Sequence, residues 1–342
     1  MKVPEPRKLK SGTWFLQMRL GGVSVPVTAE TKTQCIQAAE LIKAEYRNGK
    51  REFHKSDLTL REACERHIAR KERQRKSPET IRGYDVIMRN RFQSAMDRKV
   101  SSIKNWQELY DEDAYHLSAK TMTNTWSFIK SACKTECGIT LPNIERATPP
   151  QTEHSFLDPD QVKVFVSAAA KSKHAIAMLL HLSSCRASEV RGLTWDRVDL
   201  VNKRILIKGA MVRDKNNQLV EKAENKTKES TRYIPIFIPE LDDALKAVPE
   251  KQRTGFVVTA RANTIYTAIN KICRESGLPE IGTHGLRHSF SSLCYSLNVP
   301  IKITMQIGGW DDYNTVLKIY THLAKRDIGK YTADINKFFE KS

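Results

Sequence analysis

The spacing of apolar residues changes from a period of two to a period of about 3.6 early in the chain, and this limits the fold. Apolar and polar residues alternate over 14–20, a Gly-Gly pair follows at 21–22, and the alternation resumes over 23–27. This pattern is typical of a β-hairpin. Apolar residues at helical spacing then occupy 35–46. We therefore expect a small sheet–helix domain over 1–56.

After that domain the pattern is helical. Thr59 and Glu62 form a capping-box pair, and Ser77-Pro78 is typical of the start of another helix. Between these two predicted helices lies the basic stretch ARKERQRKS at 69–77. A solvated loop and a segment that tracks DNA phosphates are about equally favoured for it. We expect a helical domain over 57–148.

The segment ATPPQT at 147–152 has the composition of a linker, because paired prolines stop a helix and stiffen the chain. We therefore place a linker at 149–156 and a third domain at 157–342. Asp158-Pro159 opens its first helix, and a strand-rich stretch near 204–238 interrupts its helices. The predicted fold class is mainly α with small β-sheets (α+β), ending in a mixed α/β domain.

The net charge of the chain limits the kinds of partner that it is expected to bind. The chain has a formal net charge of +18, which favours a polyanion, either nucleic acid or an anionic membrane surface. No apolar run approaches the roughly 20 residues needed to cross a bilayer, and no apolar core follows the charged N-terminus as in a signal peptide. Nucleic acid is therefore the expected partner, with no membrane. The sheet–helix domain is itself basic, with 11 Lys and Arg against 5 Asp and Glu.

The seven cysteines are odd in number and scattered, which indicates reduced thiols in a cytoplasm. Cys133 and Cys137 lie four residues apart without a second pair nearby, so a zinc site is not expected.

Two short sequence segments of the last domain each contain a basic residue that, considered alone, does not indicate a catalytic site. Arg186 follows an apolar helix, and Glu189 three residues later is a sufficient ion-pair partner for it. Lys226 precedes a predicted strand that contains Ile234, near what we expect to be a hairpin tip. Alone, it would be a surface lysine.

Two further segments are equally weak evidence for a catalytic site when each is considered alone. His284 and Arg287 lie three residues apart on a helix that Thr283 can cap, and they are expected to share a face. Trp310 follows a Gly-Gly helix break, and Tyr320 lies among apolar residues of the next helix. Such a tyrosine is more often part of the core than a catalyst.

Taken together and in this order, the four segments resemble the tyrosine-recombinase family, which includes phage-type integrases. The closest matches are LRHSF around Arg287 and Tyr-Thr-His at 320–322. The family's catalytic set falls on six positions, which are Arg186, Lys226, His284, Arg287, Trp310 and Tyr320. The chain departs from the usual pattern in having Trp310 where histidine is common and in the ten-residue step to Tyr320.

The resemblance implies an enzyme that cuts and rejoins DNA through a 3′-phosphotyrosyl link with Tyr320 as the nucleophile. Arg186 and Arg287 would grip the non-bridging phosphate oxygens. His284 would accept a proton, Lys226 would be the general acid, and Trp310 would donate one hydrogen bond. No cofactor and no metal are expected, and no Walker loop is visible in the sequence.

The resemblance also implies partners. It predicts core and arm sites on double-stranded DNA for the helical and sheet domains, a homotetramer on DNA, and DNA-bending or directionality factors. An apolar stripe at the end of the chain could pack on its own domain or dock on a neighbouring protomer. Two alternative functions stay open, which are a non-catalytic or degenerate DNA-binding regulator and a type IB topoisomerase-like enzyme. An integrase of a mobile element, acting in a bacterial cytoplasm, is the favoured interpretation.

Overall fold

The computed structural model describes residues 3–20, 23–48, 58–148, 155–222 and 231–340. The chain divides into two compact units, Met1–Gln151 and Thr152–Ser342, and each is considered by itself. The dividing point falls inside the segment proposed as a linker. The Gly-Gly turn at 21–22, the paired prolines at 149–150 and Lys226 lie outside the described residues.

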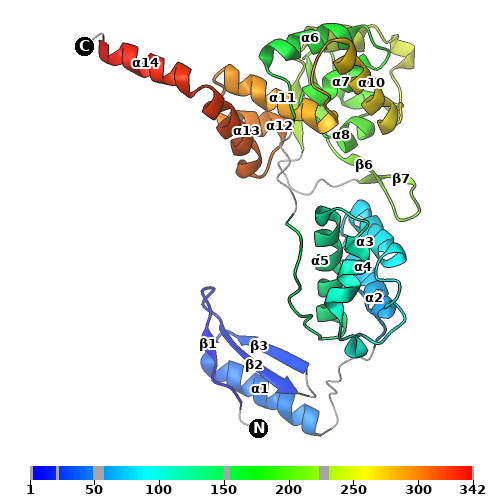
Figure 1. Ribbon diagram of the computed structural model, residues 1–342, viewed down its shortest axis with the longest axis vertical. Helices are drawn as coiled ribbons and strands as arrows, with labels where there is room; N and C mark the ends of the chain where they lie inside the picture. The colour runs from blue at the N-terminus through cyan, green and yellow to red at the C-terminus, as the bar shows by residue number, and fades with distance from the viewer. Residues whose placement is uncertain (1–2, 21–22, 49–57, 149–154, 223–230, 341–342) are drawn as a thin grey trace. The chain divides into compact units, whose positions relative to one another are not determined.

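The chain begins with a three-stranded antiparallel sheet covered by one helix (Figure 1). Strand β2 (Trp14–Leu20) lies between β1 (Arg7–Lys8) and β3 (Val23–Ala29), and the β2–β3 register pairs Trp14 with Ala29 and Leu20 with Val23. Helix α1 (Lys32–Arg47) is closed at its start by a capping box between Thr31 and Gln34.

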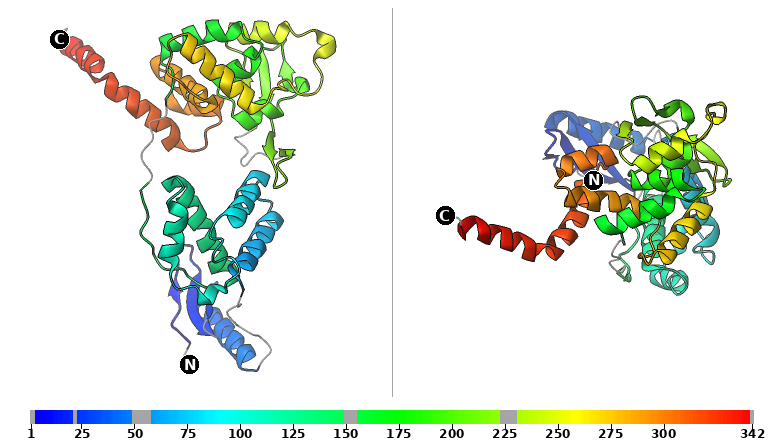
Figure 2. Two further views of the ribbon diagram at one scale, coloured as in Figure 1. Left: turned by 45° about the vertical axis from the view of Figure 1, so that its right-hand side comes forward. Right: turned by 90° about the horizontal axis from the view of Figure 1, so that it is seen from above.

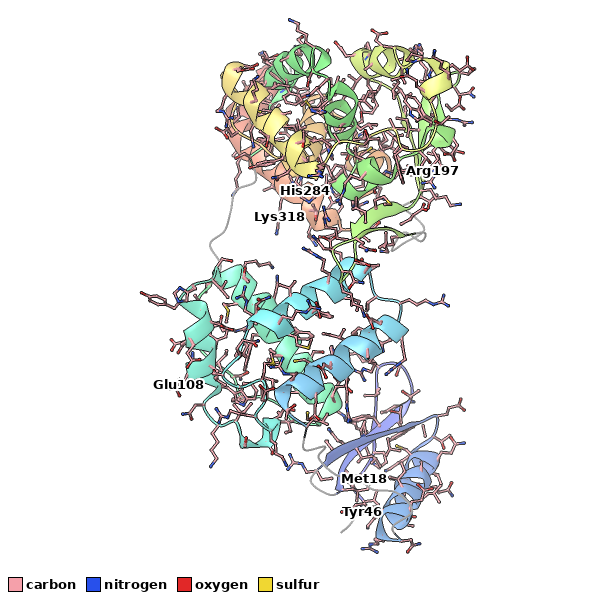
Figure 3. All side chains as sticks on the ribbon, turned by 90° about the vertical axis from the view of Figure 1, so that its right-hand side faces the viewer. Met18, Tyr46, Glu108, Arg197, His284 and Lys318 are labelled. Atoms are coloured by element: carbon pink, nitrogen blue, oxygen red, sulfur yellow. The ribbon has the colours of Figure 1, made fainter. Side chains whose placement is uncertain are left out.

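The alternation along β2 places every second side chain against α1. Leu16, Met18 and Leu20 are buried there with Cys35 and Ala39 of the helix. Met18 and Tyr46 both lie in this layer (Figure 3). The expected hairpin and helix are therefore present, and the hydrophobic core is confined to one face of the sheet.

The rest of the first unit is helical and encloses its own hydrophobic core. Its helices are α2 (Leu60–Arg73), α3 (Pro78–Asn90), α4 (Trp106–Ala114) and α5 (Ala119–Glu136), with a short 3₁₀ turn η1 (Val100–Ser102). The capping box of Thr59 and Glu62 is present, with the Thr59 N–H donating to the Glu62 carboxylate at 2.8 Å. Helix α2 runs on to Arg73, so much of the basic stretch expected between two helices is the end of the first one.

The second unit opens with helices that surround a small sheet. They are α6 (Pro159–Ala170), α7 (Ala175–Leu182), α8 (Ala187–Gly192), α9 (Pro239–Lys246) and α10 (Ala262–Glu275), with 3₁₀ turns η2 (Trp195–Arg197) and η4 (Glu250–Gln252). Asp158 and Gln161 form a capping box at the start of α6, where Pro159 is the first helical residue. The helices and the sheet share one core, with Phe165, Leu179 and Ile205 fully buried.

The strand-rich stretch forms two antiparallel pieces. Strand β5 (Arg204–Ile207) lies between β4 (Val198–Asp199) and β8 (Arg232–Pro235). A separate hairpin of β6 (Ala210–Arg213) and β7 (Leu219–Lys222) interrupts the chain between β5 and β8. Together with the helices, these sheets make the mixed α/β fold that the sequence predicts.

The unit ends with four helices, α11 (Thr283–Ser296), α12 (Ile301–Gly308), α13 (Tyr313–Arg326) and α14 (Ile328–Glu340). The expected cap of α11 is wrong. Its N-cap is Gly282 and no side chain caps it, so Thr283 is already helical. At its other end the helix stops at Ser296, and the next residue, Leu297, is 65% exposed.

Helix α14 extends away from the rest of this unit (Figure 2). Its apolar residues Ile335, Phe338 and Phe339 are exposed. No helix among the described residues is long and apolar enough to cross a membrane.

Candidate active site

Arg186 stands at the junction of α7 and α8, where the chain makes a tight turn. Ser184 has a φ of 73°, and the Nδ1 of the buried His181 lies 3.2 Å from the carbonyl oxygen of Cys185. This contact ties the residue before Arg186 back to α7. Arg186 is then the N-cap of α8, with its guanidinium half-buried.

Glu189 is the anion of the site. The Arg186 Nη1 donates to Glu189 Oε1 at 2.9 Å, and the Arg186 backbone N–H donates to Oε2 at 2.8 Å. The ion pair that the sequence offers for Arg186 therefore exists. Burial would raise the pKa of Glu189, but the charges and hydrogen bonds of Arg232 and Arg186 together outweigh burial, so the net pKa is lowered. Glu189 is therefore a buried carboxylate that stays ionised.

Arg287 reaches the same junction from α11 and is only 2% exposed. Its Nη1 donates to the carbonyl of Ser184, its Nη2 to that of Gly309 at 3.4 Å, and its guanidinium carbon lies 4.3 Å from the centroid of the Trp310 ring. Burial and then the charge of Arg186 lower the pKa of Arg287, to about 9. Its charge is therefore costly until an anion arrives.

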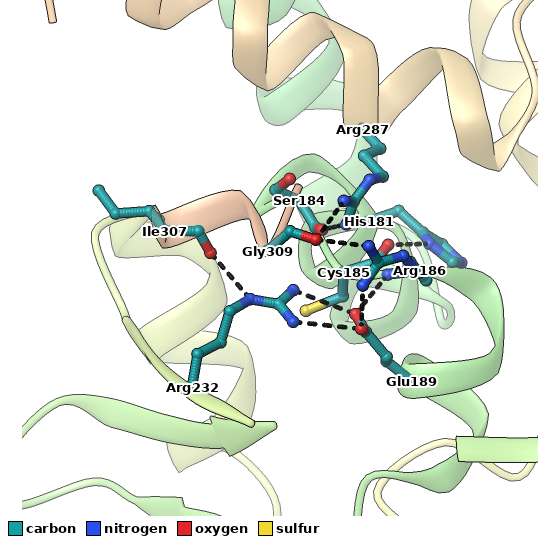
Figure 4. Close-up of polar contacts among 9 residues, drawn as sticks. All are labelled: His181, Ser184, Cys185, Arg186, Glu189, Arg232, Arg287, Ile307 and Gly309. Atoms are coloured by element: carbon teal, nitrogen blue, oxygen red, sulfur yellow. Dashed lines mark hydrogen bonds and ion pairs between the residues drawn. The ribbon is translucent and has the colours of Figure 1, made fainter. Parts of the chain in front are cut away.

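One oxygen joins the two arginines. The Gly309 carbonyl accepts hydrogen bonds from both Arg186 and Arg287 (Figure 4). Two planar guanidinium forks that converge on a single acceptor can also hold two oxygens of a tetrahedral phosphate. The arrangement is chemically suited to stabilising an anionic, five-coordinate phosphorus.

Tyr320 lies on α13 in a small apolar cluster with Phe290, Cys294 and Val316. Its hydroxyl lies 2.9 Å from the Thr304 hydroxyl and donates to the Val299 carbonyl at 3.3 Å. Burial raises the pKa of Tyr320. The phenol is therefore neutral at physiological pH in the form that the structure describes.

Trp310 and His284 complete the described part of the predicted set. Trp310 is 8% exposed, and its ring stacks on Phe290 with centroids 6.3 Å apart. His284 lies in the first turn of α11 and is exposed, whereas Arg287 is buried. The two residues that were expected to share a helix face therefore differ in their exposure to solvent. The structure thus brings Arg186, Arg287 and Trp310 together around Gly309.

Arg232 is a member of this cluster that the sequence reasoning missed. It opens β8, is 8% exposed, and binds Glu189 with both Nη atoms at 3.1 Å. A signal was present, since Arg232 precedes Ile234 by two residues and therefore lies on the buried side of the strand. Among the described residues, no group of three or more His, Cys, Asp or Glu side chains could hold a metal ion.

A helical unit with a small antiparallel sheet, converging arginines and a tyrosine on its penultimate helix has the architecture of a tyrosine-recombinase catalytic domain. The comparisons agree. A family model described as "Phage integrase family" matches residues 155–327, which is half of the chain. The chain belongs to this family, and it is a tyrosine site-specific recombinase.

Individual relatives cover more of the chain. A tyrosine recombinase XerC-like protein from Caldanaerobacter subterraneus subsp. tengcongensis is 24% identical over an alignment of 349 positions, which covers 88% of this chain and 89% of that protein. The Tn1549 transposon integrase in complex with transposon right end DNA matches with a TM-score of 0.61 at 19% identity, over 80% of this chain and 99% of that one. A lambda integrase dimer bound to a core site has a TM-score of 0.55 at 16% identity, over 93% and 94%. The two structures show a shared fold.

Proposed function

We propose that this recombinase cuts and rejoins DNA by attack of the Tyr320 oxygen on a backbone phosphate. The observation that carries the proposal is the Gly309 carbonyl, which accepts from both Arg186 and Arg287. That oxygen marks a point to which both guanidiniums can donate at once. A phosphate in the same region would replace the carbonyl as their acceptor.

In the proposed step, the Tyr320 oxygen forms a bond to phosphorus while the bond from phosphorus to the 5′-oxygen breaks. The phenol proton passes to His284, and Lys226 donates a proton to the leaving 5′-oxygen. Arg186 and Arg287 stabilise the added negative charge, and the Trp310 indole N–H donates to an oxygen of the phosphate or of the tyrosine. A 5′-hydroxyl of a partner duplex then attacks the 3′-phosphotyrosyl link and releases Tyr320.

The two modules of the first unit are proposed to bind two different kinds of DNA site. In the sheet module, assigned here to 1–56, the face away from α1 carries Arg7 stacked on Phe15 at 5.5 Å together with Gln17 and Arg19. This cationic and polar surface suits an arm site in a major groove. The helical module at 57–148 carries Arg70, Lys71 and Arg73 in the last turn of α2, and it is assigned to the core site. The linker at 149–156 would join it to the catalytic domain at 157–342.

The assembly that acts is proposed to be a homotetramer on DNA, with DNA-bending or directionality factors as accessory partners. The exposed apolar residues of α14 support association, because so much apolar surface on a projecting helix favours a partner. An integrase of a mobile element, acting in the cytoplasm of a bacterial host, is the role that these features fit best. The related Tn1549 integrase was observed with transposon right end DNA, and the lambda integrase dimer was observed bound to a core site.

A nicked suicide substrate that carries the core site tests the chemistry. The wild-type chain should become covalently linked to the 3′ end, and Tyr320→Phe should give no adduct while binding the same DNA. Tyr313→Phe is the matched control, since Tyr313 is an exposed tyrosine at the start of the same helix, and it should form the adduct normally.

The results of the cleavage and strand-exchange assays distinguish a recombinase from the two alternative functions. Binding without an adduct in the wild-type chain would indicate a non-catalytic regulator. An adduct with relaxation of supercoils but no exchange between two marked duplexes would indicate a topoisomerase-like enzyme. Strand exchange between the duplexes supports the proposal.

A further inference from the structure

Arg232 occupies a position where a charged side chain needs a specific partner. It pairs with Ile207 across the sheet and lies on the same buried side of β8 as Ile234. A guanidinium that is 8% exposed is costly to keep in such a place unless its charge and its N–H groups are satisfied.

The partners of Arg232 come from two separate helices. Its Nη1 and Nη2 donate to Oε1 and Oε2 of Glu189, each at 3.1 Å, and its Nε donates to the carbonyl of Ile307 at 2.9 Å. Figure 4 shows the guanidinium lying between these two groups. Arg232 therefore connects α8, which follows Arg186, with the end of α12, which leads to Trp310.

The same guanidinium supports Gly309. This residue has a φ of +64°, and a Cβ built on it would lie 2.6 Å from the Arg232 Cζ. The backbone of Gly309 thus packs directly on Arg232, and its carbonyl is the acceptor that Arg186 and Arg287 share. The position of that oxygen depends on where Arg232 holds the turn.

Arg232 also limits how many hydrogen bonds Glu189 accepts from the Arg186 guanidinium. Both carboxylate oxygens accept from the fork of Arg232, and the Arg186 guanidinium reaches Glu189 only through Nη1. The Nη2 of Arg186 is directed to Gly309 instead. If Arg232 were absent, Arg186 would be the one remaining cation among the described residues that donates hydrogen bonds to this buried carboxylate. The carboxylate would then attract both arms of the Arg186 fork.

We propose that Arg232 is a positioning residue for DNA cleavage. It occupies Glu189 so that Arg186 remains available to the phosphate, and it holds the turn that presents Gly309 and Trp310. The inference rests on the proposed function of Arg186 and Arg287, but it makes a distinct prediction about Glu189. Removal of the carboxylate should relieve much of the damage caused by loss of Arg232.

The test compares the full chain with Arg232→Gln, Arg232→Lys, Glu189→Gln and the double variant Arg232→Gln/Glu189→Gln. The readout is the single-turnover rate of covalent adduct formation on the suicide substrate, with DNA affinity measured in parallel. Arg232→Gln should slow the adduct at least tenfold at nearly unchanged DNA affinity. Arg232→Lys should also be slowed, because an ammonium keeps the charge without the fork.

The rate of the double variant tests whether Glu189 captures Arg186 when Arg232 is lost. It should react at least fivefold faster than Arg232→Gln, because no buried carboxylate remains to capture Arg186. If Arg232 acted only by holding the turn at Gly309, the double variant would be as slow as the single variant or slower, and that result would overturn the proposal. Denaturant unfolding of the same variants separates recovery of stability from recovery of the cleavage rate. Arg204→Gln is the control, since Arg204 pairs with Asp199 on the exposed side of the same sheet, and it should react at the wild-type rate.

A second readout does not depend on cleavage. Orthovanadate is a tetrahedral oxyanion like phosphate and readily takes a fifth oxygen ligand, and it should raise the melting temperature of the wild-type chain through Arg186 and Arg287. Its apparent affinity should fall at least fivefold in Arg232→Gln and recover in the double variant. If the wild-type chain forms no adduct, the proposed function fails, and this titration still tests whether Arg232 keeps Arg186 available to an oxyanion. Equal vanadate affinity in the wild-type chain and Arg232→Gln would overturn the inference alone.

Discussion

The hydroxyl of Tyr320 lies 2.9 Å from the hydroxyl of Thr304, a residue of α12 that is completely buried. The second contact of the phenol is the Val299 carbonyl, 3.3 Å away. These contacts hold the proposed nucleophile in a neutral, hydrogen-bonded state before DNA is engaged. The phenol must give up the hydrogen bond that it donates to Val299 before its oxygen can attack.

Replacement of Thr304 by valine should weaken this resting state. Thr304→Val keeps the shape of the side chain but removes one partly buried hydrogen bond, so the free energy of unfolding should fall by about 1 kcal/mol. If the bond is made only before attack, the adduct should form up to about fivefold faster. Denaturant unfolding and single-turnover cleavage measure the two effects.

Thr332→Val is the control, because the Thr332 hydroxyl donates to the Ile328 carbonyl on exposed α14. It should alter neither quantity. Adduct formation slowed tenfold in Thr304→Val would show that the Thr304 hydroxyl acts in the reacting state.

Gly309→Ala should be far more damaging than a matched glycine substitution elsewhere. Gly277 has a φ of +65° with nothing within 4 Å of an added Cβ, whereas Gly309 has a φ of +64° with the Arg232 guanidinium in the way. Gly277→Ala should cost about 1 kcal/mol of stability from backbone strain. Gly309→Ala adds a steric clash and should cost about 2–4 kcal/mol. Equal values in urea unfolding would contradict the close packing of Gly309 on Arg232.

His181 should make the stability of the catalytic unit depend on pH. Burial lowers its pKa to about 4, whereas the usual value is 6.5. Because the folded-state pKa is the lower one, protons favour the unfolded chain, and stability is lost as the pH falls from 6.5 toward 4. His181 alone should account for a loss of roughly 2 kcal/mol between pH 7 and pH 5.

The measurement compares wild type with His181→Gln, whose amide N–H can still donate to the Cys185 carbonyl. The difference in unfolding free energy between the two chains should shift by that amount in favour of the variant as the pH falls. Parallel curves at all pH values would show that His181 does not titrate in this way.

The C-terminal helix should matter for assembly and not for binding of a single site. Phe338 and Phe339 are 71% and 69% exposed. The double variant Phe338→Ser/Phe339→Ser should therefore retain its affinity for one core site and lose complexes that contain several protomers. Sedimentation on DNA with one or two sites measures both properties, with Asn336→Ser as the control on the same helix. Wild-type assembly by the double variant would favour packing of α14 on its own domain.

Much of the local structure follows from patterns within a few residues. The capping box at Thr59, Pro159 at the start of α6, and the alternation along β2 are all present as predicted. The errors lie at the ends of elements. Thr283 differs from expectation because α11 begins directly after Gly282, and such limits depend on packing as well as on local preference.

The amino-acid sequence by itself determined which segments are strands and helices, which faces are buried, and the order of the motifs that identify a tyrosine recombinase. Only the tertiary structure decided that Arg186, Arg232 and Glu189 form one ionic cluster and that the Gly309 carbonyl joins Arg186 to Arg287. Periodicity reports which side of an element faces inward, but not which distant element it meets. A buried charge has to be paired, and its partner is known only once the helices and strands have packed.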